Sequence, residues 1–188
     1  MNTWRIWAYT LSIATLWLIL RFAIGYYHDY DYLESRSWGI LLNLIFIVVL
    51  FFLVLYKTYS KEPQIRGHFD DFKLCLKSGI AYSVAITIAI GIYYTCSNDM
   101  NIKRVADYKY QTESLDTPEK VAIIKASIKK YENMTKEEIH QSLISDTNDN
   151  TSVKRAMLLC IACLIFCSLI YSLIVPFVFR TVMLKELQ

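Results

Sequence analysis

Residues 38–56 read WGILLNLIFIVVLFFLVLY, a run of apolar side chains that contains no formal charge. A helix of about 20 residues is long enough to cross the roughly 30 Å hydrocarbon layer of a membrane. Lipid offers the backbone no hydrogen-bond partner, and a helix satisfies its backbone groups internally. The sequence therefore predicts a transmembrane helix at this position.

Three more apolar runs, at residues 4–27, 78–96 and 156–179, flank this one. Each is also long enough to cross a membrane as a helix. The first run lacks a convincing cleavage site and is longer than the apolar core of a signal peptide, so we expect it to be retained. The sequence therefore predicts an all-α integral membrane protein, in which residues 1–188 form a single membrane domain with four transmembrane helices.

Charged residues in the connections predict the orientation. The connection after the first run carries three acidic residues and one arginine, whereas the connection after the second is rich in Lys and Arg. Short loops rich in Lys and Arg stay on the cytoplasmic side. We therefore expect both chain ends in the cytoplasm and residues 97–155 as an extracytoplasmic helical insert between the third and fourth spans. The basic residues of the second connection are Lys57, Lys61, Arg66, Lys73 and Lys77.

The insert contains two helix-start signals. In the first, Pro118 follows Asp116 and Thr117, and either of these two residues can cap a helix. In the second, Glu138 follows Thr135 by three residues, the spacing of a capping box. We expect the insert to be too short to bury a core of its own. Its apolar face should then rest on the membrane surface, on the outer ends of the spans or on a partner. The residues of that face are Val121, Ile124, Ile128 and Tyr131.

Small residues recur at every fourth position of the third apolar run. Such residues let helix backbones approach closely, which favours association in lipid. We therefore expect the third helix in the middle of the bundle, and the second helix, with its uniform large aliphatic surface, facing lipid. The residues of this small stripe are Gly79, Ser83, Thr87 and Gly91.

Three cysteines of the fourth run share one helical face. A redox or metal site would need a βαβ context or further ligands, and the sequence offers neither. We interpret these cysteines as packing residues that continue into Ser168 and Ser172 and meet the third helix. A disulfide between Cys96 and Cys160 is a separate hypothesis. The three cysteines are Cys160, Cys163 and Cys167.

Arg21 is the only charge placed well inside a predicted span, and intramembrane charges are candidate functional sites. About 9 Å of helix separates it from Tyr27 at the predicted interface. A long side chain can cover that distance by snorkelling, so we favour an anchoring role over an active one. Asn43 of the second run is its candidate hydrogen-bond partner. No Asp or Glu falls within the predicted spans, which weighs against a proton-coupled mechanism.

Four short motifs follow one another in an order that resembles a family of four-helix inner-membrane proteins of Bacteroidota, a family without an assigned function. The resemblance implies a bacterial inner membrane with the insert in the periplasm, and it implies no activity. The residues that carry it are Gly67, Phe69, Phe72, Lys77 and Gly79. The motifs are YKTYSKE (56–62), RGHFDDF (66–72), KLCLKSG (73–79) and TKEEI (135–139).

The sequence contains no metalloprotease, hydrolase or phosphate-binding motif, and its three histidines are scattered on connections. We therefore expect no enzymatic activity, no cofactor and no metal site. The formal net charge of +3 does not indicate nucleic-acid binding. The expected partners are the lipid bilayer and other membrane proteins or further copies of the chain. The favoured function is an accessory or scaffold subunit of an inner-membrane assembly. The alternatives are a small oligomeric transporter or channel and, less favoured, a membrane-embedded enzyme acting on lipid.

Overall fold

The computed structural model describes residues 3–27, 32–60 and 67–182, and every secondary-structure element among them is a helix. The chain divides into two compact units. We call the unit formed by residues 1–93 and 157–188 the bundle, and the unit formed by residues 94–156 the insert. The connections at 28–31 and 61–66, which bear on the predicted orientation, lie outside the described residues.

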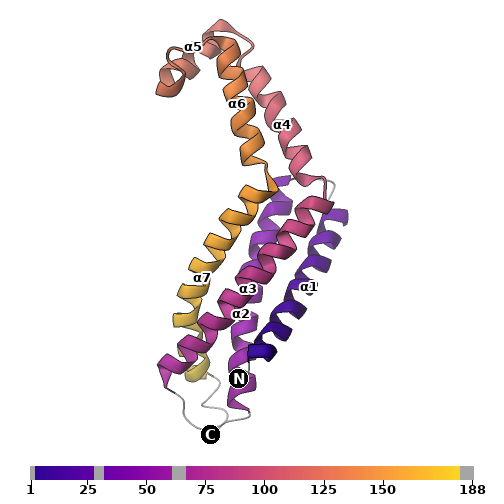
Figure 1. Cartoon of the computed structure of the whole chain (residues 1–188), viewed down its shortest axis with the longest axis vertical. Helices are drawn as coiled ribbons and strands as arrows, with labels where there is room; N and C mark the ends of the chain where they lie inside the picture. The colour runs from indigo at the N-terminus through magenta and orange to yellow at the C-terminus, as the bar shows by residue number, and fades with distance from the viewer. Residues whose placement is uncertain (1–2, 28–31, 61–66, 183–188) are drawn as a thin grey trace. The chain divides into compact units, whose positions relative to one another are not determined.

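Four long helices make up the bundle and lie side by side in Figure 1. All four are long and apolar enough to cross a membrane. They cover the four predicted spans, which confirms the expected number of membrane-length helices. All four begin earlier than predicted, α1 by one residue and the other three by three residues or more, because polar residues upstream continue the same helix. The four are α1 (Thr3–Tyr27), α2 (Tyr32–Tyr59), α3 (His68–Cys96) and α7 (Val153–Val182).

Burial within the bundle is concentrated on α3. In its most apolar stretch 67% of the residues are buried, against 39% in α2 and 22% in both α1 and α7. The predicted central position of the third helix is therefore confirmed. The prediction that the second helix faces lipid is wrong for one side of it, because the large aliphatic surface of α2 also fills the bundle interior. The fully buried residues on that side are Ile47, Leu50, Phe51, Val54 and Leu55.

The cysteines of α7 lie beside the buried line of that helix, contrary to the packing interpretation. Cys163 is exposed, and Cys160 and Cys167 are only partly buried. The buried line runs through Leu164, Ser168 and Ser172. The expected packing surface is therefore found at the two serines and not at the three cysteines. In the described chain Cys96 and Cys160 do not form a disulfide.

Two helices of the insert, those that start at Pro118 and Lys136, begin where the sequence predicted. The Thr117 side chain accepts a hydrogen bond from the backbone N–H of Lys120, and Thr135 and Glu138 form the expected capping box. Figure 1 shows α4 and α6 running alongside each other. Tyr108 of α4 links them by a hydrogen bond, which its hydroxyl donates to Asn148 Oδ1 of α6 at 2.6 Å. The elements are α4 (Asp99–Ser114), α5 (Pro118–Ser127), the 3-10 helix η1 (Lys129–Tyr131) and α6 (Lys136–Asn150).

A small hydrophobic core holds the insert together. Leu115, Tyr131 and Ile139 are buried in it, and Val121 and Ile124 pack against them. The prediction that the insert is too short to bury a core is therefore wrong. Residues from the end of α4 and from α5, η1 and α6 meet in this core, and the apolar face of α5 is covered mainly by the neighbouring segments of the insert itself.

Candidate functional site

The small stripe of α3 forms a close contact with α7. Gly79, Ser83, Thr87 and Gly91 are all buried. A Cβ atom added to Gly79 would lie 2.6 Å from the Cβ of Ser168, and the hydroxyl oxygens of Ser83 and Ser168 are 3.3 Å apart. Because each hydroxyl also donates to a carbonyl of its own helix, no polar group here needs a ligand. The stripe is a packing surface between two helices.

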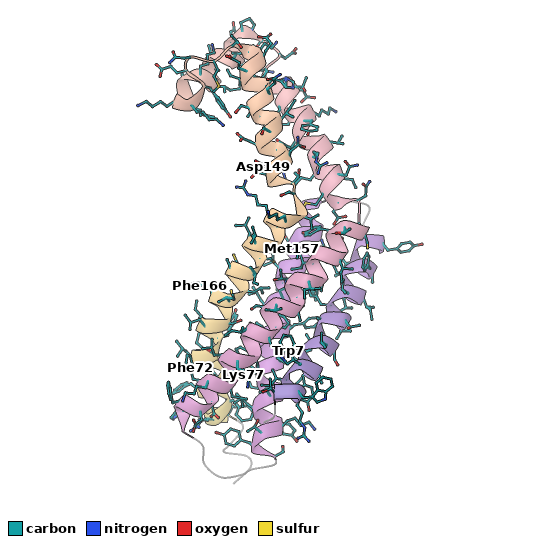
Figure 2. All side chains as sticks on the ribbon, in the orientation of Figure 1. Trp7, Phe72, Lys77, Asp149, Met157 and Phe166 are labelled. Atoms are coloured by element: carbon teal, nitrogen blue, oxygen red, sulfur yellow. The ribbon has the colours of Figure 1, made fainter. Side chains whose placement is uncertain are left out.

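The same contact continues toward the other end of α3. A Cβ atom on Gly91 would lie 2.8 Å from the sulfur of Met157, which is labelled in Figure 2. Methionine adapts its shape readily, so this end of the contact tolerates change better than the serine end.

Arg21 is enclosed by helices of the bundle. Its side chain is only 2% exposed, and its guanidinium lies 4.5 Å from the centre of the Tyr93 ring. A Cβ atom on Gly39 would come within 3.3 Å of the Arg21 Nε atom, so the glycine leaves room for the guanidinium. Trp17, one turn earlier, meets the edge of the same Tyr93 ring. Arg21 is therefore a buried cation-π anchor between helices.

Asn43 contacts a different residue from the one expected. The Tyr82 hydroxyl donates to two oxygens of Asn43, the backbone oxygen at 3.3 Å and the side-chain oxygen at 3.4 Å. Both residues are buried. This contact links α2 and α3.

A buried charged cluster that the sequence interpretation missed joins three helices. Asp71 of α3 is fully buried, and its Oδ2 atom accepts from Arg180 of α7 at 2.8 Å from Nε and 2.7 Å from Nη2. The Tyr59 hydroxyl of α2 donates to the same oxygen at 2.7 Å and accepts from Arg180 at 2.9 Å. Among the described residues the second carboxylate oxygen, Oδ1, has no hydrogen-bond partner. We call these three residues the charge cluster.

The spacing of α3 contained a signal for this cluster. The four-residue period of the small stripe, extended backwards from Gly79, passes through Cys75 and reaches Asp71. On α7 the same period, extended forwards from Ser168, reaches Arg180. The predicted third span began at residue 78, whereas the helix begins at His68. That difference left Asp71 outside the predicted span, although it lies in the first turn of α3.

The docking residues predicted on the insert are only partly available. Tyr131 is 3% exposed and belongs to the core, and Val121 and Ile124 pack against that core. Ile128 retains 43% exposure. The predicted docking face is therefore mainly an internal surface of the insert.

A different surface of the insert is open. Tyr110 is 73% exposed and Ile123 is 63% exposed, and both line a groove of about 350 Å³ between α4 and α5. Glu113 and Lys120 stand at this groove, and the ammonium of Lys120 donates to the Glu113 backbone oxygen at 2.9 Å. We call this the insert groove.

Metal ligands do not gather in the part of the chain that the structure describes: it holds no group of three or more His, Cys, Asp or Glu side chains able to bind an ion. The fold is thus that of an all-helical protein with four membrane-length helices and a folded polar insert. No protein-family model, curated protein or solved structure matches the chain.

Proposed function

We propose that the protein is an accessory or scaffold subunit of a bacterial inner-membrane assembly. In this proposal the four long helices span the membrane with both chain ends in the cytoplasm, and the insert docks a neighbouring protein outside. The charge bias of the connections and the resemblance noted above support this orientation and location. The packing role of the α3 stripe supports a structural function for the bundle.

The observation that carries the proposal is the insert groove. Exposing large apolar side chains next to one another to water is unfavourable in free energy, so such exposed clusters mark contact surfaces. Tyr110 has the character of an interface anchor, being aromatic and rigid with a polar tip. Glu113 and Lys120 supply the polar rim that surrounds the apolar centre of a typical interface. The docking residues we propose are therefore Tyr110 and Ile123.

In-cell photo-crosslinking tests the proposal. A photoreactive phenylalanine analogue replaces Tyr110 or Ile123 in the full chain, with Asp149, an exposed residue of α6, as the control position. We expect both groove positions to give the same crosslinked membrane protein and the control to give none. Ile123→Asp should abolish the product formed from position 110. Equal crosslinking from Asp149, or no product from either groove position, contradicts the docking function.

The charge cluster supports a second candidate, a small oligomeric transporter. Charged residues buried among membrane-length helices frequently line ion pathways, and Asp71 has one carboxylate oxygen without a partner among the described residues. Flux measurements on purified protein in liposomes test this candidate. Transport of an ion that is lost in Asp71→Asn, while the variant stays folded, would favour it over the scaffold. Absence of flux through the unaltered protein would rule it out.

A further inference from the structure

Helix α7 contains a proline near its end. Pro176 lies inside the helix and is buried, and α7 continues beyond it to Val182. A proline has no backbone N–H, so Pro176 cannot donate the helical hydrogen bond to the carbonyl of Ser172. Sharp bends in helices occur mostly at such positions. Residues 177–182, which we call the end arm, are therefore joined to the rest of α7 by a weakened turn.

Two side chains of the end arm contact other helices of the bundle. Phe179 is fully buried, and its ring stacks on the ring of Tyr59 of α2 with the two ring centres 5.7 Å apart. Arg180 belongs to the charge cluster, in which it donates to Asp71 of α3 and to the Tyr59 hydroxyl. Phe177, by contrast, is 65% exposed. One side of the end arm is therefore bound to α2 and α3, while its other side faces away from the bundle.

The contact between Arg180 and Asp71 leaves part of the carboxylate unsatisfied. Both guanidinium nitrogens that donate to Asp71 bind the same oxygen, Oδ2, whereas in the described part of the chain the buried Oδ1 atom has no hydrogen-bond partner. A buried ion pair offsets the cost of desolvation only when its remaining polar atoms are hydrogen-bonded as well. Asp71 lies in the first turn of α3, so water reaches Oδ1 as soon as the end arm moves away. The closed arrangement is therefore only moderately favoured over an open one in which water solvates this oxygen.

We propose that the end arm is a hinged latch, which opens about Pro176 when the charge cluster dissociates. In the closed state Arg180 holds Asp71, and the neighbouring phenylalanine stacks on Tyr59. Opening withdraws both side chains together and gives water access to Asp71 and to Cys75, a fully buried residue one turn further along α3. A hinge of this kind converts a local change into the movement of a whole segment. The inference concerns the bundle alone, so it is independent of the docking function of the insert.

The labelling rate of the Cys75 thiol tests the inference. The reporter protein is the full chain in membrane vesicles made permeable to the reagent, with Cys75 as its only cysteine. A buried thiol is inert toward a water-soluble maleimide, so the rate of labelling measures how often the end arm opens. We expect slow but measurable labelling of this reporter. The residues replaced by alanine are Cys96, Cys160, Cys163 and Cys167.

Two substitutions should change the labelling rate in opposite directions. Tyr59→Phe removes the hydroxyl that links Asp71 to Arg180 but keeps the ring on which Phe179 stacks. It should speed up labelling about fivefold, the effect of one net hydrogen bond lost. Pro176→Ala restores the missing backbone donor, and it should slow labelling about fivefold because one hydrogen bond is gained at the hinge.

A matched control separates opening of the end arm from loosening of the whole bundle. It carries Ile6→Cys as its only cysteine, because Ile6 is 1% exposed and lies near the start of α1. A hydrogen bond of 2.9 Å from Lys77 Nζ to Thr3 Oγ1 places that start at the same end of the bundle as the charge cluster. Tyr59→Phe should leave labelling at position 6 unchanged. Equal acceleration at positions 6 and 75, or an unchanged rate at position 75 in either variant, overturns the inference.

Discussion

The bundle and the insert both expose large apolar side chains, yet the exposure has a different meaning in each. In the bundle Phe166 and many other residues project outward from α7 (Figure 2), as expected of a helix long and apolar enough for lipid. In the insert most exposed residues are polar, and Tyr110 and Ile123 stand out. An exposed apolar side chain therefore indicates a contact surface only where the surrounding surface is polar.

The two units also differ in the interactions that stabilise their folds. Lipid does not drive apolar helices together, so close packing and polar links between helices must specify the bundle. The Ser83–Ser168 contact and the charge cluster are such links. The insert instead depends on burial of a few apolar residues and on well-capped helix ends. The following predictions test this division.

The largest expected effect is that of removing one member of the charge cluster. Asp71→Leu removes the buried carboxylate that accepts from the mostly buried Arg180 and should lower the free energy of unfolding by about 3–5 kcal/mol. Unfolding in mixed micelles measures this loss. The double variant Asp71→Leu, Arg180→Leu should recover most of it, because no buried charge is left uncompensated. A single variant as stable as the unaltered protein would contradict the role of polar links in the bundle.

Truncation of the insert core should have the next largest effect. Ile139 is fully buried, and Ile139→Ala should destabilise the insert by about 2–3 kcal/mol through lost burial and the cavity left behind. Hydrogen exchange should rise in α5 and α6 and stay unchanged in α2. Ile123→Ala, the exposed counterpart on α5, should change exchange little. Equal increases in α2 and α6 would show that the two units do not unfold separately.

A smaller effect is expected from one added methyl group in the α3–α7 contact. Gly79→Ala brings a Cβ atom to 2.6 Å from Ser168 and 2.9 Å from Phe51, a clash that should cost about 1–2 kcal/mol. Unfolding in micelles measures it. Ser168→Gly in the same chain should recover part of the loss. A neutral Gly79→Ala variant would mean that the close approach is not needed.

The smallest effect concerns the start of α6. Hydrogen bonds from the backbone N–H and the hydroxyl of Thr135 lower the pKa of Glu138 below its ordinary value. The contribution of Glu138 to stability is therefore present above the ordinary Glu range and is lost as the pH falls through the lowered value. Hydrogen exchange at the first turn of α6 should rise on acidification. Glu138→Gln should remove that pH dependence, and an unchanged dependence would assign it to another group.

Local sequence patterns were sufficient to predict most of the helices of this protein. Uninterrupted apolar runs indicate the four long helices, and the capping residues Thr117 and Thr135 indicate where α5 and α6 begin. The four-residue period of small residues predicted the central position of α3. Each of these features depends on neighbours within a few turns of the same segment, so it can be read along the chain.

Only the tertiary structure decided which faces meet. Asp71 and Arg180 are 109 positions apart. The four-residue spacing places each of them on the line of small residues of its own helix, but it does not show that the two lines meet at these residues. Likewise, the apolar face of α5 could have faced a partner or the insert itself, and the fold placed Tyr131 and Ile139 against each other in one core. Pattern determines that a face is apolar or charged, whereas the partner of that face is set by how distant segments pack.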